Sequence, residues 1–306
     1  MKAAIALASI AIATVVVPAQ KFSVSVEGVR VDVLVTDGRR PVAGLGVADF
    51  ELRDSGVLQH IDSVALEDVP LSVMLVLDTS ASVAGQPLVD LKRAASAVVR
   101  LLAKSDRAAL MTFWASVTLA SGWTGDRAQL ERAIAKVGTG GFTALHDAAY
   151  AGLTLRDNGA GRTLVVIFSD GQDTASWLPG QTVIDIARRN DAVVYAVGLL
   201  PLAGARLPGY RLDFWSGIQF PVPKASAGTL MESFLDALAE DTGGQFINAE
   251  RSDRLRDTFV RIVNESRSRY LLTYSPQGVD AGGWHPIEVT VKGRKLKIKA
   301  RRGYLR

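Results

Sequence analysis

The chain has 306 residues, of which 48% are hydrophobic and 22% charged, and these globular values exclude a disordered or collagen-like chain. It contains no cysteine, which excludes disulfides, cysteine-held zinc, iron–sulfur clusters and thiol catalysis. The formal net charge is +4, but the segment 264–306 holds ten Lys or Arg against three Asp or Glu. The basic excess is therefore local, and we expect no nucleic-acid partner.

Residues 1–19 have the pattern of a signal peptide. Lys2 precedes an apolar run over residues 3–17, and a Val-Pro-Ala sequence ending at residue 19 supplies small residues for cleavage. The alternative is a short uncleaved anchor, because the run is close to the ~17 residues that can span a bilayer. The single Lys and Pro18 favour cleavage. We expect an exported protein, periplasmic, cell-surface or secreted, with no integral membrane segment after cleavage.

The region 20–69 is predicted to form short β-strands. Apolar and polar residues alternate in FSVSVEGVRVDVLVTD, which places Val29, Val31, Val33 and Val35 on one face. VADFELRD and LQHIDSVAL continue this pattern, and segments with a helical period are absent. These residues form an N-terminal β segment.

Between residues 70 and 265 the pattern changes to alternating strands and helices. LSVMLVLD is a continuous apolar run, which is typical of a central parallel strand covered on both faces. The alternation predicts an α/β fold with a doubly wound, mostly parallel open sheet of Rossmann-like type. We expect strands at 71–78, 107–115, 116–123, 162–170, 191–200 and 244–249, and helices at 87–104, 126–137, 143–155, 182–190, 230–242 and 252–268.

The region 266–306 returns to short strands, in RYLLTYSP, HPIEVTVKG and KLKIKARRG. Because chain termini often lie close together in a domain, the two terminal β segments are expected to form one β module with the α/β domain inserted between them. The alternative is two separate β extensions.

Three polar sequences lie where elements of the central domain meet. Asp78, Ser80 and Ser82 follow the first central strand at a spacing of two residues, and on an extended loop this spacing turns their oxygens toward one point. Ligands of open α/β sheets bind beyond the carboxyl ends of strands, and hard oxygen donors suit Mg²⁺ or Mn²⁺ better than zinc. The alternative is that Ser82 only caps the next helix.

The other two sequences are Asp170-Gly171, after the RTLVVIFS strand, and Gly140-Gly141-Phe142-Thr143, before the helix ALHDAAYAGL. Taken alone, the first is an ordinary turn and Thr143 is a helix N-cap. Together with the Asp78 loop, however, all three present oxygens at one edge of one sheet. Their conjunction predicts a single site.

These sequences resemble a known family. DTSAS, the Thr of GGFTALHDAA and the SDG that closes a strand are similar to the metal-ion-dependent adhesion site of von Willebrand factor A (VWFA) domains, over about residues 70–265. The flanking segments are similar to those of a bacterial exported VWFA-related group. In one position, Ala81, the chain departs from the glycine that the family usually has.

The resemblance implies a function for each site residue. Ser80 and Ser82 would bind Mg²⁺ or Mn²⁺ directly, Thr143 would do so in at least one state, and Asp78 and Asp170 would bind directly or through water. An ion with few direct carboxylates keeps much of its charge, and it would attract an Asp or Glu carboxylate from a protein partner.

A long aromatic- and proline-rich segment, PLAGARLPGYRLDFWSGIQFPVPK, leaves the sheet at the same edge. Loops of this length are often functional, and its aromatic side chains are candidate ligand contacts. The alternative is that they pack a local cluster of their own. The candidates are Tyr210, Phe214, Trp215 and Phe220.

The sequence offers little sign of catalysis. It lacks the G-x-S-x-G, G-x-x-x-x-G-K-[ST] and H-E-x-x-H motifs, and a lone histidine such as His146 at a helix start is more often structural than catalytic. We therefore expect a non-enzymatic module for metal-dependent cell adhesion or other protein binding. The alternatives are a metal-assisted hydrolase that uses Asp78 and Asp170, and a structural envelope protein whose metal site is vestigial.

Overall fold

A computed structural model describes residues 28–38, 40–66, 69–157, 161–170, 172–199, 210–212, 219–221 and 227–306, with 210–212, 219–221 and 227–233 described by their backbone alone. The predicted signal peptide, residues 1–19, lies outside these ranges. In the part of the chain that is described, no helix is long and apolar enough to cross a membrane.

Helices and strands occur in nearly all the predicted places. The helices are α1 (Gln86–Leu101), α2 (Arg127–Lys136), α3 (Leu145–Thr154), α4 (Gly180–Arg188), α5 (Ala227–Asp241) and α6 (Leu255–Arg267), with single 3₁₀ turns η1 (Val47–Asp49), η2 (Ala81–Val83) and η3 (Ser252–Arg254). The strands are β1 (Val29–Asp37), β2 (Arg40–Pro41), β3 (Phe50–Asp54), β4 (Val57–Gln59), β5 (Ile61–Ala65), β6 (Leu71–Asp78), β7 (Arg107–Phe113), β8 (Val117–Thr124), β9 (Arg162–Ser169), β10 (Val193–Gly198), β11 (Tyr210–Leu212), β12 (Gln219–Pro221), β13 (Gln245–Asn248), β14 (Tyr270–Tyr274), β15 (Trp284–Val291), β16 (Lys297–Lys299) and β17 (Gly303–Leu305).

The central sheet has the strand order β13-β10-β9-β6-β7-β8. Neighbouring strands are parallel except for β8, which pairs antiparallel with β7 at one edge. The reason is the short connection between β7 and β8, since a parallel crossover needs a dozen or more residues. The fold is therefore α/β and Rossmann-like, with a mixed sheet.

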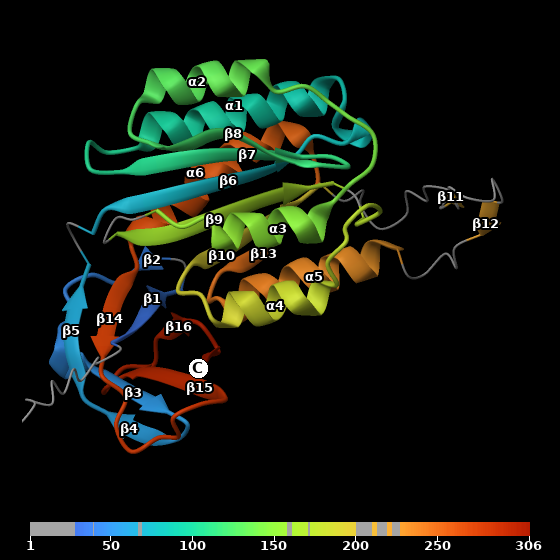
Figure 1. Cartoon of the computed structure of the whole chain (residues 1–306). Helices are drawn as coiled ribbons and strands as arrows, with labels where there is room; N and C mark the ends of the chain where they lie inside the picture. Colours follow the sequence, from blue (N-terminus) through green and yellow to red (C-terminus); the bar gives the residue numbers. More distant parts are fainter. Residues whose placement is uncertain are drawn as a thin grey trace, which may run out of the picture.

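Helices cover both faces of this sheet (Figure 1). One face packs against α1, α2 and α6, through residues such as Leu91, Leu130 and Phe259. The other face packs against α3, α4 and α5. Because β6 lies in the middle with cover on both sides, all of its residues are buried, as its continuous apolar run predicted.

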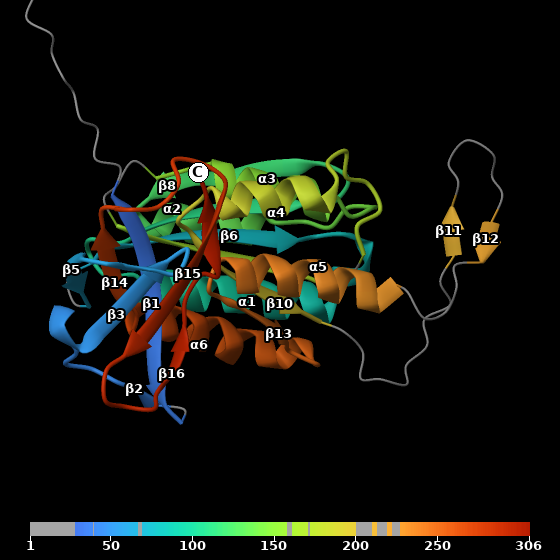
Figure 2. The same ribbon diagram turned by 90° about the horizontal axis from the view of Figure 1, so that it is seen from below.

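Strands from the two terminal segments pair with each other. β1 pairs antiparallel with β14, and β3 pairs antiparallel with β15. Val31, Val33 and Val35 of β1 are fully buried in the core that these strands share, which confirms the predicted valine face. The paired strands lie together beside the central sheet (Figures 1 and 2), and we call them the β unit.

A buried ionic cluster joins the β unit to the central sheet. Arg162, the first residue of β9, forms an ion pair with Asp32 of β1, and both side chains are almost completely buried. The same guanidinium donates hydrogen bonds to the carbonyl oxygens of Ser266 and Arg269. Arg269 in turn donates to the hydroxyl of Tyr195. We call this cluster the junction.

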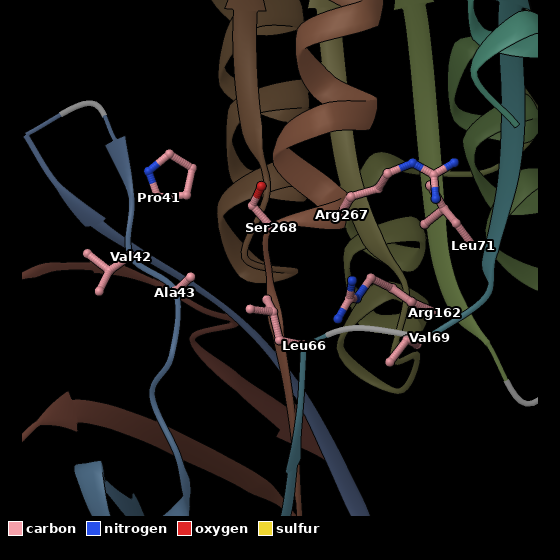
Figure 3. Close-up of a pocket in the computed structure, with 9 residues that line it drawn as sticks. All are labelled: Pro41, Val42, Ala43, Leu66, Val69, Leu71, Arg162, Arg267 and Ser268. Atoms are coloured by element: carbon pink, nitrogen blue, oxygen red, sulfur yellow. The ribbon is translucent and has the colours of Figure 1, made fainter. Parts of the chain in front are cut away.

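A pocket of about 370 Å³ opens beside the junction, between the β2 turn, the start of β6 and the end of α6 (Figure 3). Apolar side chains line most of it, and the arginines enter from the central domain. Its lining residues are Pro41, Val42, Ala43, Leu66, Val69, Leu71, Arg162, Arg267 and Ser268.

Removing the carboxylate of Asp32 from the junction is expected to lower the free energy of unfolding strongly. In Asp32→Ala the guanidinium of Arg162 stays buried without its counter-ion, and breaking such a pair costs about 3–5 kcal/mol. We expect urea unfolding to show a loss of this size. As a control, Glu51→Ala removes a partly exposed surface ion pair with Arg53, and surface pairs are worth at most about 1 kcal/mol. Equal losses in the two variants would contradict this account.

Candidate metal centre

The site begins with Asp78, the last residue of β6, whose side chain is fully buried. One carboxylate oxygen accepts a hydrogen bond from the backbone N–H of Ser80 at 2.9 Å. The other accepts one from the hydroxyl of Ser169 at 2.7 Å. Since Ser169 ends the neighbouring strand β9, two adjacent strand ends fix the position of this carboxylate.

Ser80 and Ser82 bring two hydroxyls to the same place. Their Oγ atoms are 3.0 Å apart, and the Ser82 hydroxyl donates to Oδ1 of Asp170 at 2.9 Å. Ser82 lies inside η2, whereas α1 starts later, after Gly85, without a side-chain cap. The alternative that Ser82 is a helix cap is therefore wrong.

The loop that carries Thr143 lies against the loop that carries Asp78, Ser80 and Ser82. The N–H of Gly140 donates to the carbonyl of Thr79 at 2.8 Å, and the N–H of Ala81 donates to the carbonyl of Gly141 at 3.1 Å. These two bonds fasten the Thr143 loop to the Asp78 loop, and the Thr143 side chain is buried.

The N-terminus of α3 is capped by Asp173, not by Thr143. Oδ1 of Asp173 accepts hydrogen bonds from the N–H groups of Leu145 at 2.8 Å and His146 at 3.3 Å. Asp173 lies in the loop after β9 and satisfies the free donors of the first helical turn. The alternative that Thr143 serves as the N-cap is therefore wrong.

The two carboxylates at the site carry negative charge that no basic side chain among the described residues balances. Burial raises the pKa of Asp78, and burial together with the nearby charge of Asp78 raises the pKa of Asp170 to about 6. Among the described residues, no Lys, Arg or His forms an ion pair with either group. Such a site favours a cation, because a nearby positive charge would offset the free-energy cost of burying both carboxylates.

The oxygen spacing fits a small divalent ion. Octahedral Mg²⁺ holds oxygens at 2.0–2.1 Å, so neighbouring ligands are about 2.8–3.0 Å apart. The Ser80–Ser82 separation is 3.0 Å and the Ser82–Asp170 separation is 2.9 Å. Within the described ranges, no group of three or more His, Asp or Glu could hold a metal. A metal at this edge would therefore rely on hydroxyl oxygens.

Ala81 does not distort the site. It is the first residue of η2 and is exposed, and the only non-glycine residues with positive φ in the described chain are Ser55 and Glu250. The glycine that the family usually has here is therefore not required by the backbone conformation of this loop.

The aromatic candidates of the long loop stay a prediction. Phe214 and Trp215 lie outside the described residues. Tyr210 belongs to β11 and Phe220 to β12, two short strands that pair antiparallel, and both residues are described by their backbone alone.

His146 has a structural place. Its Nδ1 lies 3.2 Å from the carbonyl oxygen of Leu178, and its ring lies 4.5 Å from that of Phe234. These contacts join the start of α3 to the loop before α4 and to α5, and they give this histidine a packing function.

Sequence reasoning missed several residues that hold the site. Ser169 orients Asp78, and Thr174 accepts a hydrogen bond from the N–H of Thr143 at 3.0 Å. Ser169 was adjacent to a candidate in the SDG sequence, and that adjacency was its only signal. The sequence gives no signal for Thr174, since its hydrogen bond with Thr143 depends on how the loop after β9 folds across α3.

Fold and site together define an α/β domain with a hydroxyl-rich candidate cation site at the carboxyl edge of its sheet. Residues 73–172 match the family model of the von Willebrand factor type A domain. The chain therefore contains a von Willebrand factor type A domain. Comparison with curated proteins finds no match.

Two of the similar solved structures, with TM-scores of 0.51, share this fold. A von Willebrand factor type A protein from Catenulispora acidiphila is similar over 89% of this chain and 76% of its own, with 10% identity and a TM-score of 0.51. Proximal thread matrix protein 1 from the mussel byssus is similar over 69% of this chain and 49% of its own, with 17% identity and a TM-score of 0.51. An aerotolerance-related membrane protein from Bacteroides fragilis covers 64% of this chain and 99% of its own, with 16% identity and a TM-score of 0.47.

A pair of glycine variants tests the fastening of the Thr143 loop. A Cβ on Gly140 would lie 2.2 Å from Cδ2 of Trp114, whereas a Cβ on Gly141 would meet nothing within 4 Å. We expect Gly140→Ala to displace the loop, to destabilise the protein by about 1–3 kcal/mol and to weaken metal binding. Gly141→Ala is the matched control. Thermal unfolding with and without Mg²⁺ checks this, and identical behaviour of the two variants would contradict it.

Asp170→Asn tests the charge at the site. The pKa of Asp170 is raised from 3.8 to about 6 in the metal-free folded protein, so its contribution to stability is complete below pH 4 and is lost as the pH rises through 6. In EDTA at pH 7.5, we expect the variant to be more stable than wild type by on the order of 1 kcal/mol, after discounting for solvent screening.

The difference between Asp170→Asn and wild type is expected to disappear below pH 4, where both side chains are neutral. Asp280→Asn is the control, since Asp280 is exposed and lies in the β unit's loops. Urea unfolding at pH 4, 5, 6 and 7.5 measures both. A variant that is less stable than wild type at pH 7.5 without metal would contradict the charge argument.

Proposed function

We propose that this chain is a non-enzymatic, adhesion-type module that binds a protein partner through a divalent cation. The observation that carries the proposal is the row of oxygens beside the buried carboxylate of Asp78, in which Ser82 Oγ lies 3.0 Å from Ser80 Oγ and 2.9 Å from Asp170 Oδ1. Proteins with this domain generally act as adhesion or structural modules, which agrees with the proposal.

Each residue has a distinct function in this scheme. The hydroxyls of Ser80, Ser82 and Thr143 bind the ion, and the carboxylates of Asp78 and Asp170 bind it directly or through water. The bound ion, Mg²⁺ or Mn²⁺, supplies a positive charge with room for one more oxygen. We propose that an Asp or Glu carboxylate of the partner fills that position.

The donors are hard oxygens, which favour Mg²⁺ or Mn²⁺ over softer ions. The structure of the similar mussel byssus protein has been solved with zinc in its metal-ion-dependent adhesion site (MIDAS) motif. Zinc is therefore a necessary comparison for this chain. We keep Mg²⁺ or Mn²⁺ as the proposed ion because the site offers hydroxyls and carboxylates.

We also propose the wider organisation that the sequence predicts. Residues 1–19 would direct export to the periplasm, the cell surface or the medium. Residues 20–69 and 266–306 would form one β module around the von Willebrand factor type A domain at 70–265. The pairing of β1 with β14 and of β3 with β15 supports this division.

Metal titration tests the proposed site. We expect Mg²⁺ or Mn²⁺ to raise the unfolding temperature of wild type, because an ion at 100 times its Kd stabilises by about 2.7 kcal/mol, equivalent to several degrees for a chain of this size. The double variant Ser80→Ala/Ser82→Ala loses both hydroxyls and is expected to show no rise. Calorimetric titration with Mg²⁺, Mn²⁺ and Zn²⁺ gives the affinities and the order of preference.

Ala81→Gly is the control for this test, since it changes the same loop and keeps every oxygen. We expect its metal affinity to stay within about twofold of wild type, because η2 does not need a glycine at this position. A wild type without any metal response would leave the vestigial-site alternative, and an equal response in the double variant would place the ion elsewhere.

A further inference from the structure

Three exposed aromatic side chains lie on the loops that build the candidate metal centre. They are Trp177, which is 94% exposed, Phe142, which is 47% exposed, and Trp114, which is 41% exposed. Single exposed apolar residues on a surface are ordinary, whereas several exposed aromatic side chains on the loops around one site make those loops a candidate contact surface. We call these three residues the aromatic rim.

Each residue of the aromatic rim is connected to the loop that carries Thr143, by sequence or by a contact. Phe142 immediately precedes Thr143. The ring of Trp114 packs against Gly140, in the loop that carries Thr143. Trp177 follows Thr174 by three residues, and the N–H of Thr174 donates to the carbonyl of Thr143 at 2.8 Å. Three residues span at most about 11 Å, so the backbone of Trp177 lies within that distance of Thr174, whose backbone contacts the Thr143 loop.

The loop that carries Trp177 is held in one conformation. The backbone N–H groups of Trp177 and Leu178 donate to the two carboxylate oxygens of Asp147, at 3.0 and 2.9 Å. Asp147 belongs to the first turn of α3, and Asp173 caps the same helix from the other end of the loop. The backbone of the loop is therefore fixed at both ends while the Trp177 side chain faces solvent.

This combination is typical of a binding hot spot. A tryptophan buries roughly 150–250 Å² of surface when it is covered, and tryptophan is among the side chains enriched at the energetic centre of interfaces. Because Asp147 and Asp173 already order the loop, its backbone would lose little conformational entropy when a partner covers Trp177. The fold itself makes little use of this side chain, since 94% of it is exposed.

We propose that the aromatic rim is the specificity surface of the metal site, and that the partner presents an Asp or Glu flanked by apolar residues. This inference rests on the proposed function. The carboxylate complements the charge of the cation, and the flanking apolar side chains cover Trp177 and Phe142. A lone carboxylate such as acetate would meet the cation and leave the rim uncovered, so it would bind more weakly than a peptide that does both.

Selection from a library of displayed random nonapeptides tests the proposal. The purified full chain is immobilised with Mg²⁺, and bound peptides are released with EDTA. We expect the released peptides to contain an Asp or Glu with Trp, Phe, Leu, Ile or Pro within three positions. Release of acidic peptides without enrichment of apolar neighbours, or no metal-dependent binding at all, would overturn the inference.

The most enriched peptide is then synthesised and titrated against variants. We expect Trp177→Ala to weaken its binding at least tenfold and Phe142→Ala at least threefold, while the rise in unfolding temperature with Mg²⁺ stays at the wild-type value. Leu58→Ala is the matched control, because Leu58 is also an exposed apolar residue, at 57%, but lies on β4 of the β unit. It is expected to bind the peptide as wild type does.

The outcomes separate this inference from the proposed function. If wild type shows no response to metal, the proposed function fails and the inference fails with it. If metal binds normally but Trp177→Ala and Phe142→Ala bind the peptide as wild type does, the metal site stands and the aromatic rim is refuted. A blue shift of tryptophan fluorescence on peptide binding, lost in Trp177→Phe, would locate the contact at this side chain.

Discussion

The concentration of negative charge at Asp78 and Asp170 is the constraint on which the rest of the site depends. Asp78 ends β6 and Asp170 follows the adjacent parallel strand β9, and the pairing of Leu77 with Phe168 brings the strand ends level. No described basic side chain balances them, and burial raises the pKa of both groups. The surrounding hydroxyls can lower this cost but cannot cancel a charge. The fold thus keeps a local instability that a bound cation would relieve, as sites that trade stability for function commonly do.

Most of the fold follows from the sequence, because long periodic segments are governed by one physical requirement. LSVMLVLD lies under helices on both sides, so every residue must be apolar or paired, and the continuous run shows this directly. The valine alternation of β1 reflects a strand with one face in a core. The direction of β8 is set by the short turn that connects it to β7. Its turn at Trp114–Ser116 leaves no room for a crossover, and connection length, not hydrophobicity, decides the pairing.

The sequence indicated some residues of the candidate site and gave no signal for others, and the reason is how far apart in sequence their contacts lie. Asp78, Ser80 and Ser82 are close in sequence, so their spacing carries geometric information. Ser169 and Asp173 contribute through contacts across strands and helices, which depend on register and loop path. The aromatic candidates Tyr210 and Phe220 were chosen because aromatic and proline residues are dense around them. Trp177 stands alone in its segment, and exposure of a single side chain leaves no trace in local composition.

The junction has a mechanical consequence. The metal centre lies at the carboxyl ends of β6 and β9, whereas Arg162 meets Asp32 at the opposite end of β9. Tension applied by a tethered partner at the metal centre would run lengthwise through β9 and enter β1 at that ion pair. From there it would be shared with β14, which pairs antiparallel with β1. β1 and β14 come from the two terminal segments of the chain, so the load would be carried by two strands that only the folded state holds together.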